Sequence, residues 1–281
     1  MVSEVEHAGH RHRVEAEIYD ARAREAFARL RDEDLRVDPA IPPYPNDEHV
    51  DFLTFGLARL GDVSGRSILE VGSGGGELSV YLALQGARVS GIDVSEANVR
   101  LAARRAAVNG VGNRVRFRAS PIESLDDADE SYDIVIGNQV LHHFDLPNAL
   151  PNVRRLLRKG GRAIFCEPVL LIPESVRRVR ESGLGTRILP RRVDTPTERS
   201  ISVGDVRLVR ETFPDSAFYP FQLLTRVQNF VPVPERLLAL LSRADRLLLR
   251  YVAPVRTLCR FLVIEVARDR AVTPADGSVR L

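Results

Sequence analysis

The chain has 281 residues, of which 44% are hydrophobic and 28% are charged, and its formal net charge is +2. This composition excludes a disordered chain, and the apolar runs are too short for a membrane-spanning helix. The two cysteines, Cys166 and Cys259, form no CxxC pair, so we expect buried thiols and no metal site. The first residues lack a signal-peptide pattern, and together with the thiols this leads us to expect a cytoplasmic location.

Residues 1–60 are expected to form an N-terminal tail and a helical lid. Residues 1–13 are polar and rich in histidine, and we expect no regular structure there. A helical pattern follows from Val14 to Leu35, and four prolines between 38 and 46 separate it from a second helix that ends near residue 60. Because both helices precede the core, they are candidates to cover a binding site.

Residues 61–168 alternate between short apolar runs and helical patterns. This alternation predicts an α/β fold with a mostly parallel, doubly wound sheet that has helices on both faces. The predicted strands are 67–71, 88–93, 115–119, 134–138 and 162–167. The predicted helices between them are 77–85, 96–109 and 148–157.

A glycine-rich turn follows the first of these strands, in the sequence Glu70-Val71-Gly72-Ser73-Gly74-Gly75-Gly76, and Asp93 ends the second strand. Glycine allows backbone angles and a close ligand approach that a side chain would block, and the N-terminus of the next helix favours an anionic group. A carboxylate such as Asp93 can accept both hydroxyls of a ribose. This arrangement predicts a nucleoside cofactor at the carboxyl ends of the strands.

Two classes of cofactor fit such a turn. A dinucleotide-binding oxidoreductase remains the alternative, but its third small position would fall on Glu77, close to a pyrophosphate. The spacing Glu70-x-Gly72-x-Gly74-x-Gly76 is instead similar to that of the class I S-adenosylmethionine-dependent methyltransferases. The resemblance extends to Asp93 and to the segments 133–144 and 158–162, and it covers about residues 64–168.

The resemblance implies a Rossmann-like, seven-stranded sheet whose last two strands form a hairpin, and S-adenosylmethionine as the cofactor. Glu70 would contact the methionine ammonium directly or through the loop, Asp93 would hold the ribose, and Val94 would lie beside the adenine. The expected cofactor-binding residues are Glu70, Gly72, Ser73, Gly74, Gly76, Asp93, Val94, Ser120, Ile122, Asn138 and Val140.

One position departs from the family pattern. Family members usually carry an acidic residue just after the third strand, where this chain has Pro121 between Ser120 and Ile122. Pro121 cannot accept a hydrogen bond from the adenine amino group, although Ile122 can donate its backbone N–H to a ring nitrogen. This departure keeps a non-catalytic binding or scaffolding subunit open as a second hypothesis.

His142 and His143 follow the fourth strand, where family members often place groups that face the substrate. A histidine there can accept a proton from a hydroxyl, an amine or an acidic carbon. The sequence does not tell which of the two acts, and either one could simply pack or bond within the loop. Tyr44 and His49 are weaker candidates in the lid.

Residues 169–281 are expected to hold an insertion at 169–200, a helix after Ser202, strands at 218–224 and 261–267, and helices that shape the acceptor site. Between the two strands, residues 234–250 place Arg236, Arg243 and Arg250 on one stripe and leucines on the opposite face. Such a helix can bury its apolar face, cap an apolar pocket or lie in a membrane interface.

Positive charge gathers in the same half of the chain. From residue 151 to residue 260 there are 21 Lys and Arg against 10 Asp and Glu, a net of +11. This excess is either a composition bias or a sign of an anionic substrate or membrane surface.

These patterns together predict one compact domain, and the resemblance implies that it transfers a methyl group from S-adenosylmethionine by in-line displacement. We expect a small, apolar or lipid-like acceptor, no nucleic acid because aromatic and basic residues do not interleave, and peripheral contact with an anionic membrane as a further hypothesis. The acceptor, the methylated atom and the oligomeric state are left open.

Overall fold

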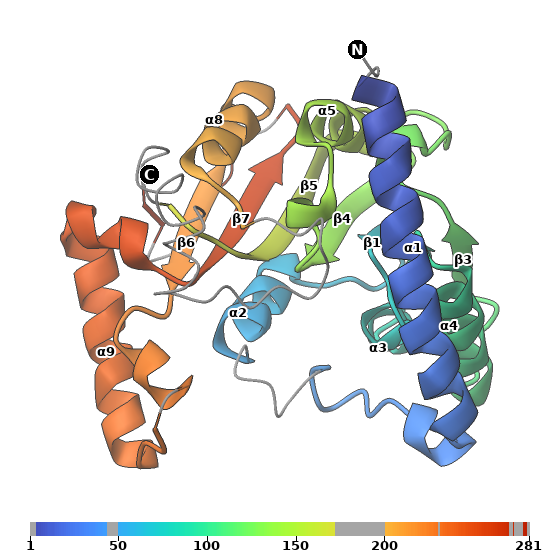
Figure 1. The fold of residues 1–281 in the computed structure, drawn as a ribbon, viewed down its shortest axis with the longest axis horizontal. Coiled ribbons are helices and arrows are strands. Elements are labelled where there is room, and N and C mark those ends of the chain that lie inside the picture. The colour runs from blue at the N-terminus through green and yellow to red at the C-terminus, as the bar shows by residue number, and fades with distance from the viewer. Residues whose placement is uncertain are drawn as a thin grey trace.

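A single seven-stranded sheet organises the protein in the computed structural model, which describes residues 4–43, 50–171, 200–229, 231–269, 272 and 278–279. The strand order is β3-β2-β1-β4-β5-β7-β6 (Figure 1). The first five strands pair in parallel, and β7 runs antiparallel to both β5 and β6. The strands are β1 (Ser67–Val71), β2 (Arg88–Asp93), β3 (Val115–Ala119), β4 (Tyr132–Asn138), β5 (Leu157–Pro168), β6 (Ala217–Phe221) and β7 (Phe261–Ala267).

The predicted fold class is confirmed, with helices on both faces of this sheet. The helices are α1 (Glu4–Arg29), α2 (Val50–Leu60), α3 (Glu77–Leu84), α4 (Glu96–Val108), α5 (Leu146–Leu156), α8 (Val203–Thr212) and α9 (Glu235–Tyr251). Buried side chains of α2, α3 and α4 pack in one core and those of α5 and α8 in a second. The alternating apolar runs of the chain thus cover both faces of the parallel strands.

The N-terminal segment differs from its prediction. Helix α1 begins at Glu4, so the expectation that residues 1–13 lack regular structure was wrong. The sequence there has a weak amphipathic pattern, and the helix is held by tertiary contacts, since α1 packs along α4. Asp20 of α1 accepts hydrogen bonds from the Ser95 hydroxyl and, at 3.0 Å, from the backbone N–H of Ala97 at the start of α4. This bonding lowers the pKa of Asp20.

Helix α2 lies away from the place expected for a lid. It packs on β5 and β7, where Phe52 stacks on Phe261 with ring centroids 4.4 Å apart. The two expected helices therefore separate, and α1 alone lies over the carboxyl ends of β1 and β2 (Figure 1). Most of the expected insertion at 169–200 lies outside the described residues, and Val169 pairs with Ile201 at its ends.

Helix α9 lies beside β6, at the edge of the sheet opposite β3 (Figure 1). Its anchor is the buried Asp245, which accepts hydrogen bonds from the backbone N–H groups of Leu223, Leu224 and Thr225. Asp245 and Leu249 are the buried residues of the helix, so most of its leucine face is not part of the core. Within the described ranges, no helix has the length and apolarity needed to cross a membrane.

Gly76 is the residue at which the glycine turn meets α4. Its φ is +78°, and a Cβ there would lie 2.7 Å from the Ala102 Cβ and 2.9 Å from the Ala102 Cα. Gly65 has a similar φ of +71° but open space around it. The two glycines therefore share a left-handed backbone and differ in the room for a side chain.

We expect Gly76→Ala to lower the free energy of unfolding by about 1–3 kcal/mol more than Gly65→Ala does, because only the first adds a collision to the backbone strain. Urea denaturation of the two variants measures the difference. Equal losses in both would show that α3 and α4 can separate at no cost.

Candidate functional site

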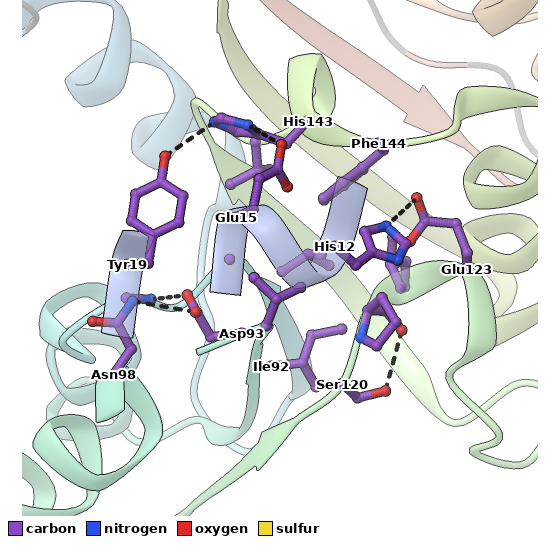
Figure 2. Close-up of a pocket in the computed structure, with 17 residues that line it drawn as sticks. His12, Glu15, Tyr19, Ile92, Asp93, Asn98, Ser120, Glu123, His143 and Phe144 are labelled. Atoms are coloured by element: carbon purple, nitrogen blue, oxygen red, sulfur yellow. Dashed lines mark hydrogen bonds and ion pairs between the residues drawn. The ribbon is translucent and has the colours of Figure 1, made fainter. Parts of the chain in front are cut away.

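A cavity of about 220 Å³ lies at the carboxyl ends of β1 and β2 and the loops after β3 and β4 (Figure 2). These strands meet where the strand order reverses between β1 and its two neighbours, which is the usual ligand position in open α/β sheets. Helix α1 forms the opposite wall with His12, Glu15 and Tyr19.

The structure brings most of the predicted residues together. Those that line the cavity are Gly72, Gly74, Asp93, Val94, Ser120, Ile122, Val140 and His143, together with Pro121. Glu70, Ser73, Gly76, Asn138 and His142 are not in its wall. Ser73 and Gly76 belong to the turn itself, and Tyr44 and His49 lie outside the described residues.

Asp93 shapes the glycine turn from below while it faces the cavity. Its Oδ2 accepts the backbone N–H of Gly74 at 2.8 Å, and its Oδ1 accepts the backbone N–H of Ser95 at 2.9 Å and the Asn98 amide at 3.2 Å. Burial nevertheless raises the pKa of the Asp93 carboxyl above its usual value. The sequence analysis missed Asn98, whose only signal was its place in the first turn of α4.

Glu123 is a second cavity carboxylate that the sequence analysis missed. Its Oε1 accepts the backbone N–H of Asp145 at 2.8 Å and lies 3.4 Å from the His12 Nε2 (Figure 2). Its Oε2 is buried and has no hydrogen-bond partner among the described residues. Burial raises the pKa of this carboxyl, but the hydrogen bonds from His12 and from the Asp145 backbone outweigh it and lower the pKa overall. Glu123 therefore places a charged carboxylate in the cavity wall, with one buried oxygen that has no partner among the described residues.

His143 faces the cavity between two side chains of α1. Its Nδ1 lies 3.1 Å from Glu15 Oε1, and its Nε2 lies 3.3 Å from the Tyr19 hydroxyl (Figure 2). Glu15 is itself buried. A carboxylate beside Nδ1 favours the tautomer with a proton on that nitrogen, so that Nε2 accepts from Tyr19.

His142 occupies a different environment, and its prediction as a group that faces the substrate does not fit its position. Its side chain is buried, and its Nδ1 lies 2.8 Å from Glu167 Oε2. Glu167 Oε1 also accepts the backbone N–H groups of Val140 and Leu141 at 2.8 and 2.9 Å. The two histidines follow each other in a short 3-10 helix (Leu141–His143), and their ring centroids lie 4.2 Å apart. His142 is the buried member of this pair and supports the loop from within.

Glu70 lies beneath the glycine turn and outside the cavity wall. It is buried, and its Oε2 accepts a hydrogen bond from the Ser79 hydroxyl. Burial raises the pKa of this carboxyl to about 8. Among the described residues, no group of three or more His, Cys, Asp or Glu side chains is placed to hold a metal ion.

The raised pKa predicts a pH-dependent stability. The folded protein favours the neutral form of Glu70. The stability that this preference contributes is therefore fully present below pH 4.5, the pKa of the carboxyl in the unfolded chain, and it is lost as the pH rises to about 8. Between these two pH values, we expect the free energy of unfolding of Glu70→Gln to rise relative to that of the wild type by up to about 1.4 kcal/mol per pH unit. Urea denaturation across the pH range measures this, with Glu96→Gln, at an exposed position of α4, as the control. Parallel curves for Glu70→Gln and the wild type would contradict it.

Comparison with known proteins matches the central part of the chain to a known domain. A methyltransferase domain model matches residues 69–165. A ubiquinone biosynthesis O-methyltransferase of Bordetella parapertussis is 35% identical over 116 residues, which are 41% of this chain and 47% of that protein. One from Rhizobium leguminosarum bv. trifolii is 38% identical over 100 residues, 35% of this chain and 39% of the relative. The matched segment thus spans less than half of each relative.

Solved structures agree on the fold. The YcgJ protein of Bacillus subtilis superposes with a TM-score of 0.54 at 18% identity, over 79% of this chain and 100% of that one. Geranyl diphosphate C-methyltransferase from Streptomyces coelicolor A3(2) does so with a TM-score of 0.53 at 15% identity, over 83% and 88% of the two chains. The family match, the glycine turn and the cavity at the reversal of strand order agree: the chain contains a class I S-adenosylmethionine-dependent methyltransferase domain.

Proposed function

We propose that the protein transfers a methyl group from S-adenosylmethionine to the hydroxyl oxygen of a small, apolar or lipid-like acceptor. The observation that carries the proposal is the cavity in which Asp93, Glu123 and His143 meet beneath α1. The family match supports the reaction class, and the names of the relatives, ubiquinone biosynthesis O-methyltransferases, support an oxygen acceptor. The dinucleotide alternative has no comparable support.

The cavity residues suit the nucleoside part of this cofactor. Asp93 lies at the position where a ribose would bind, with Val94 beside it. Glu123 offers a buried carboxylate oxygen without a partner, which an adenine amino group can satisfy. Glu123 would thus accept the hydrogen bond from the adenine amino group that Pro121 cannot accept. This weakens the hypothesis of a non-catalytic subunit. Glu70 would act on the methionine end through the glycine turn that covers it.

We expect Glu123→Gln to weaken binding of S-adenosylhomocysteine by about 10- to 150-fold, which corresponds to a charge-assisted hydrogen bond of about 1.5–3 kcal/mol. Asp93→Ala should weaken it at least as much, because the turn loses its support. Calorimetry measures both, with Glu96→Gln as the control.

The deaminated analogue S-inosylhomocysteine tests the assigned partner of Glu123. It carries a carbonyl in place of the adenine amino group, so the loss caused by Glu123→Gln should disappear with this ligand. An equal loss with both ligands would mean that Glu123 supports the cavity without contacting the base.

The protein's part in methyl transfer is to align the acceptor and to receive its proton. When bound, S-adenosylmethionine supplies a methyl group on a sulfonium centre whose leaving thioether is neutral. His143 Nε2 would accept the acceptor's hydroxyl proton, so that the oxygen forms its new bond to carbon as the carbon–sulfur bond breaks. Glu15 would hold the imidazole by its Nδ1–H and stabilise the positive charge that the ring gains. The acceptor hydroxyl would take the place of the Tyr19 hydroxyl at Nε2.

We expect His143→Gln to lower kcat by about 10²- to 10⁴-fold and to leave the affinity for S-adenosylhomocysteine nearly unchanged. Glu15→Gln keeps an acceptor for the Nδ1–H of His143 but removes the negative charge, so this variant should lose less kcat than His143→Gln does. Tyr19→Phe is the matched control and should retain most of the turnover. A radiolabelled-methyl assay with lipid, small-molecule and protein fractions identifies the acceptor.

The pH profile distinguishes a proton acceptor from a structural histidine. If His143 accepts the proton, the pH dependence of turnover in the wild type should be absent from the residual activity of His143→Gln. An unchanged profile in the variant would exclude His143 as the base.

The cytoplasmic location and the absence of nucleic acid binding remain predictions from the sequence.

A further inference from the structure

Helix α9 presents three separate stripes along its length. At 100° per residue, Leu238, Ser242, Asp245 and Leu249 share the face that packs toward the domain. The next stripe holds four arginines: Arg236, Arg243, Arg246 and Arg250. The third stripe is apolar and faces away from the packed side, and it consists of Leu237, Leu240, Leu247 and Tyr251.

The apolar stripe is exposed to a degree that packing within the domain does not explain. The relative accessibility is 46% for Leu237, 61% for Leu240, 60% for Leu247 and 69% for Tyr251. Contacts of the opposite face, above all those of the buried Asp245, already hold the helix in place. Segments that contact α9 add further exposed apolar side chains, namely Leu224, Val227, Val252 and Leu258. Exposed apolar side chains that gather on neighbouring elements in this way usually mark an interaction site.

The charge beside this stripe is of one sign. Glu235 is the exposed acidic residue of α9, against four arginines. Within the part of the chain that the structure describes, no carboxylate pairs with Arg236, Arg243 or Arg246. Arg236, Arg243 and Arg246 therefore lie at the edge of the apolar stripe without a carboxylate partner among the described residues.

An anionic surface that also accepts apolar side chains fits this combination. A lipid bilayer provides both at once, since leucine and tyrosine enter the headgroup region and arginine pairs with phosphate. A second copy of the chain would bring the same arginines into the contact without a surplus of acidic residues. Leu247 and Tyr251 of this stripe also border a cavity of about 530 Å³ between α9 and β6, whereas Leu237 and Leu240 do not.

We propose that α9 docks the protein on an anionic lipid bilayer, with Leu237, Leu240, Leu247 and Tyr251 inserted in the headgroup region and the neighbouring arginines on lipid phosphates. The helix lies parallel to the membrane plane. This contact is at the β6 edge of the sheet (Figure 1). The cofactor cavity lies instead at the ends of β1 and β2. No described residue of α9 lines that cavity. The docking surface is therefore separate from the cofactor cavity.

Vesicle co-sedimentation of the full chain tests the proposal. The wild type should bind vesicles of phosphatidylcholine with phosphatidylglycerol and should not bind phosphatidylcholine alone, and high salt should release it. Leu240→Ser with Leu247→Ser should lower the partition coefficient at least about tenfold. Arg236→Gln with Arg243→Gln should cause a loss of similar size and reduce the salt dependence.

Two control variants lie on α8. Val203→Ser removes an exposed apolar side chain and Arg207→Gln removes an exposed arginine there, and neither should change vesicle binding. Thermal unfolding and binding of S-adenosylhomocysteine should be unchanged in all variants, which separates lost docking from lost folding. The proposal is overturned if the wild type binds neither vesicle, or if the α9 and α8 variants behave alike. Conversion of a dimer to a monomer by the leucine changes, seen by light scattering, would assign the stripe to a second copy instead.

Discussion

The hydrogen bonds that Asp93 accepts from Gly74, Ser95 and Asn98 connect the parts on which the site depends. They tie the end of β2 to the glycine turn after β1 and to the first turn of α4. The turn needs this support because Gly72, Gly74 and Gly76, which all have positive φ angles, lose more conformational freedom on folding than other residues do. The same carboxylate then faces the cavity, so that structure and binding share one group.

Helix α1 completes the site from far away in the sequence. Asp20 caps the start of α4, and this contact places Glu15 and Tyr19 against His143, more than 120 positions further along the chain. The packing of α1 on α4 therefore closes the cavity on that side. A histidine that would otherwise be an ordinary loop residue gains a carboxylate partner, and with it a defined tautomer and a defined orientation.

The two edges of the sheet serve different purposes. Near β1 and β2, the carboxyl ends of parallel strands leave backbone groups and side chains directed at one cavity. At the other edge, the antiparallel pair β6 and β7 carries α9, which is anchored by Asp245 and exposes an apolar stripe with arginines beside it. An acceptor role for α9 at the cofactor cavity, which the leucine pattern suggested, has no support in this arrangement. The separation lets the outer helix change its partner without disturbing the glycine turn.

The sequence by itself determined the sheet, the glycine turn, the place of Asp93 and the class of cofactor, because these features arise from local patterns: alternating apolar runs, glycine at left-handed positions, and a carboxylate at a strand end. The start of α1 at Glu4 was not predictable, since its stability comes from packing on α4. Nor were the roles of Glu123 and Glu15 or the difference between His142 and His143. Only the tertiary structure decided which carboxylate meets which histidine and which leucines stay in solvent, because burial and pairing depend on segments that are distant in the chain.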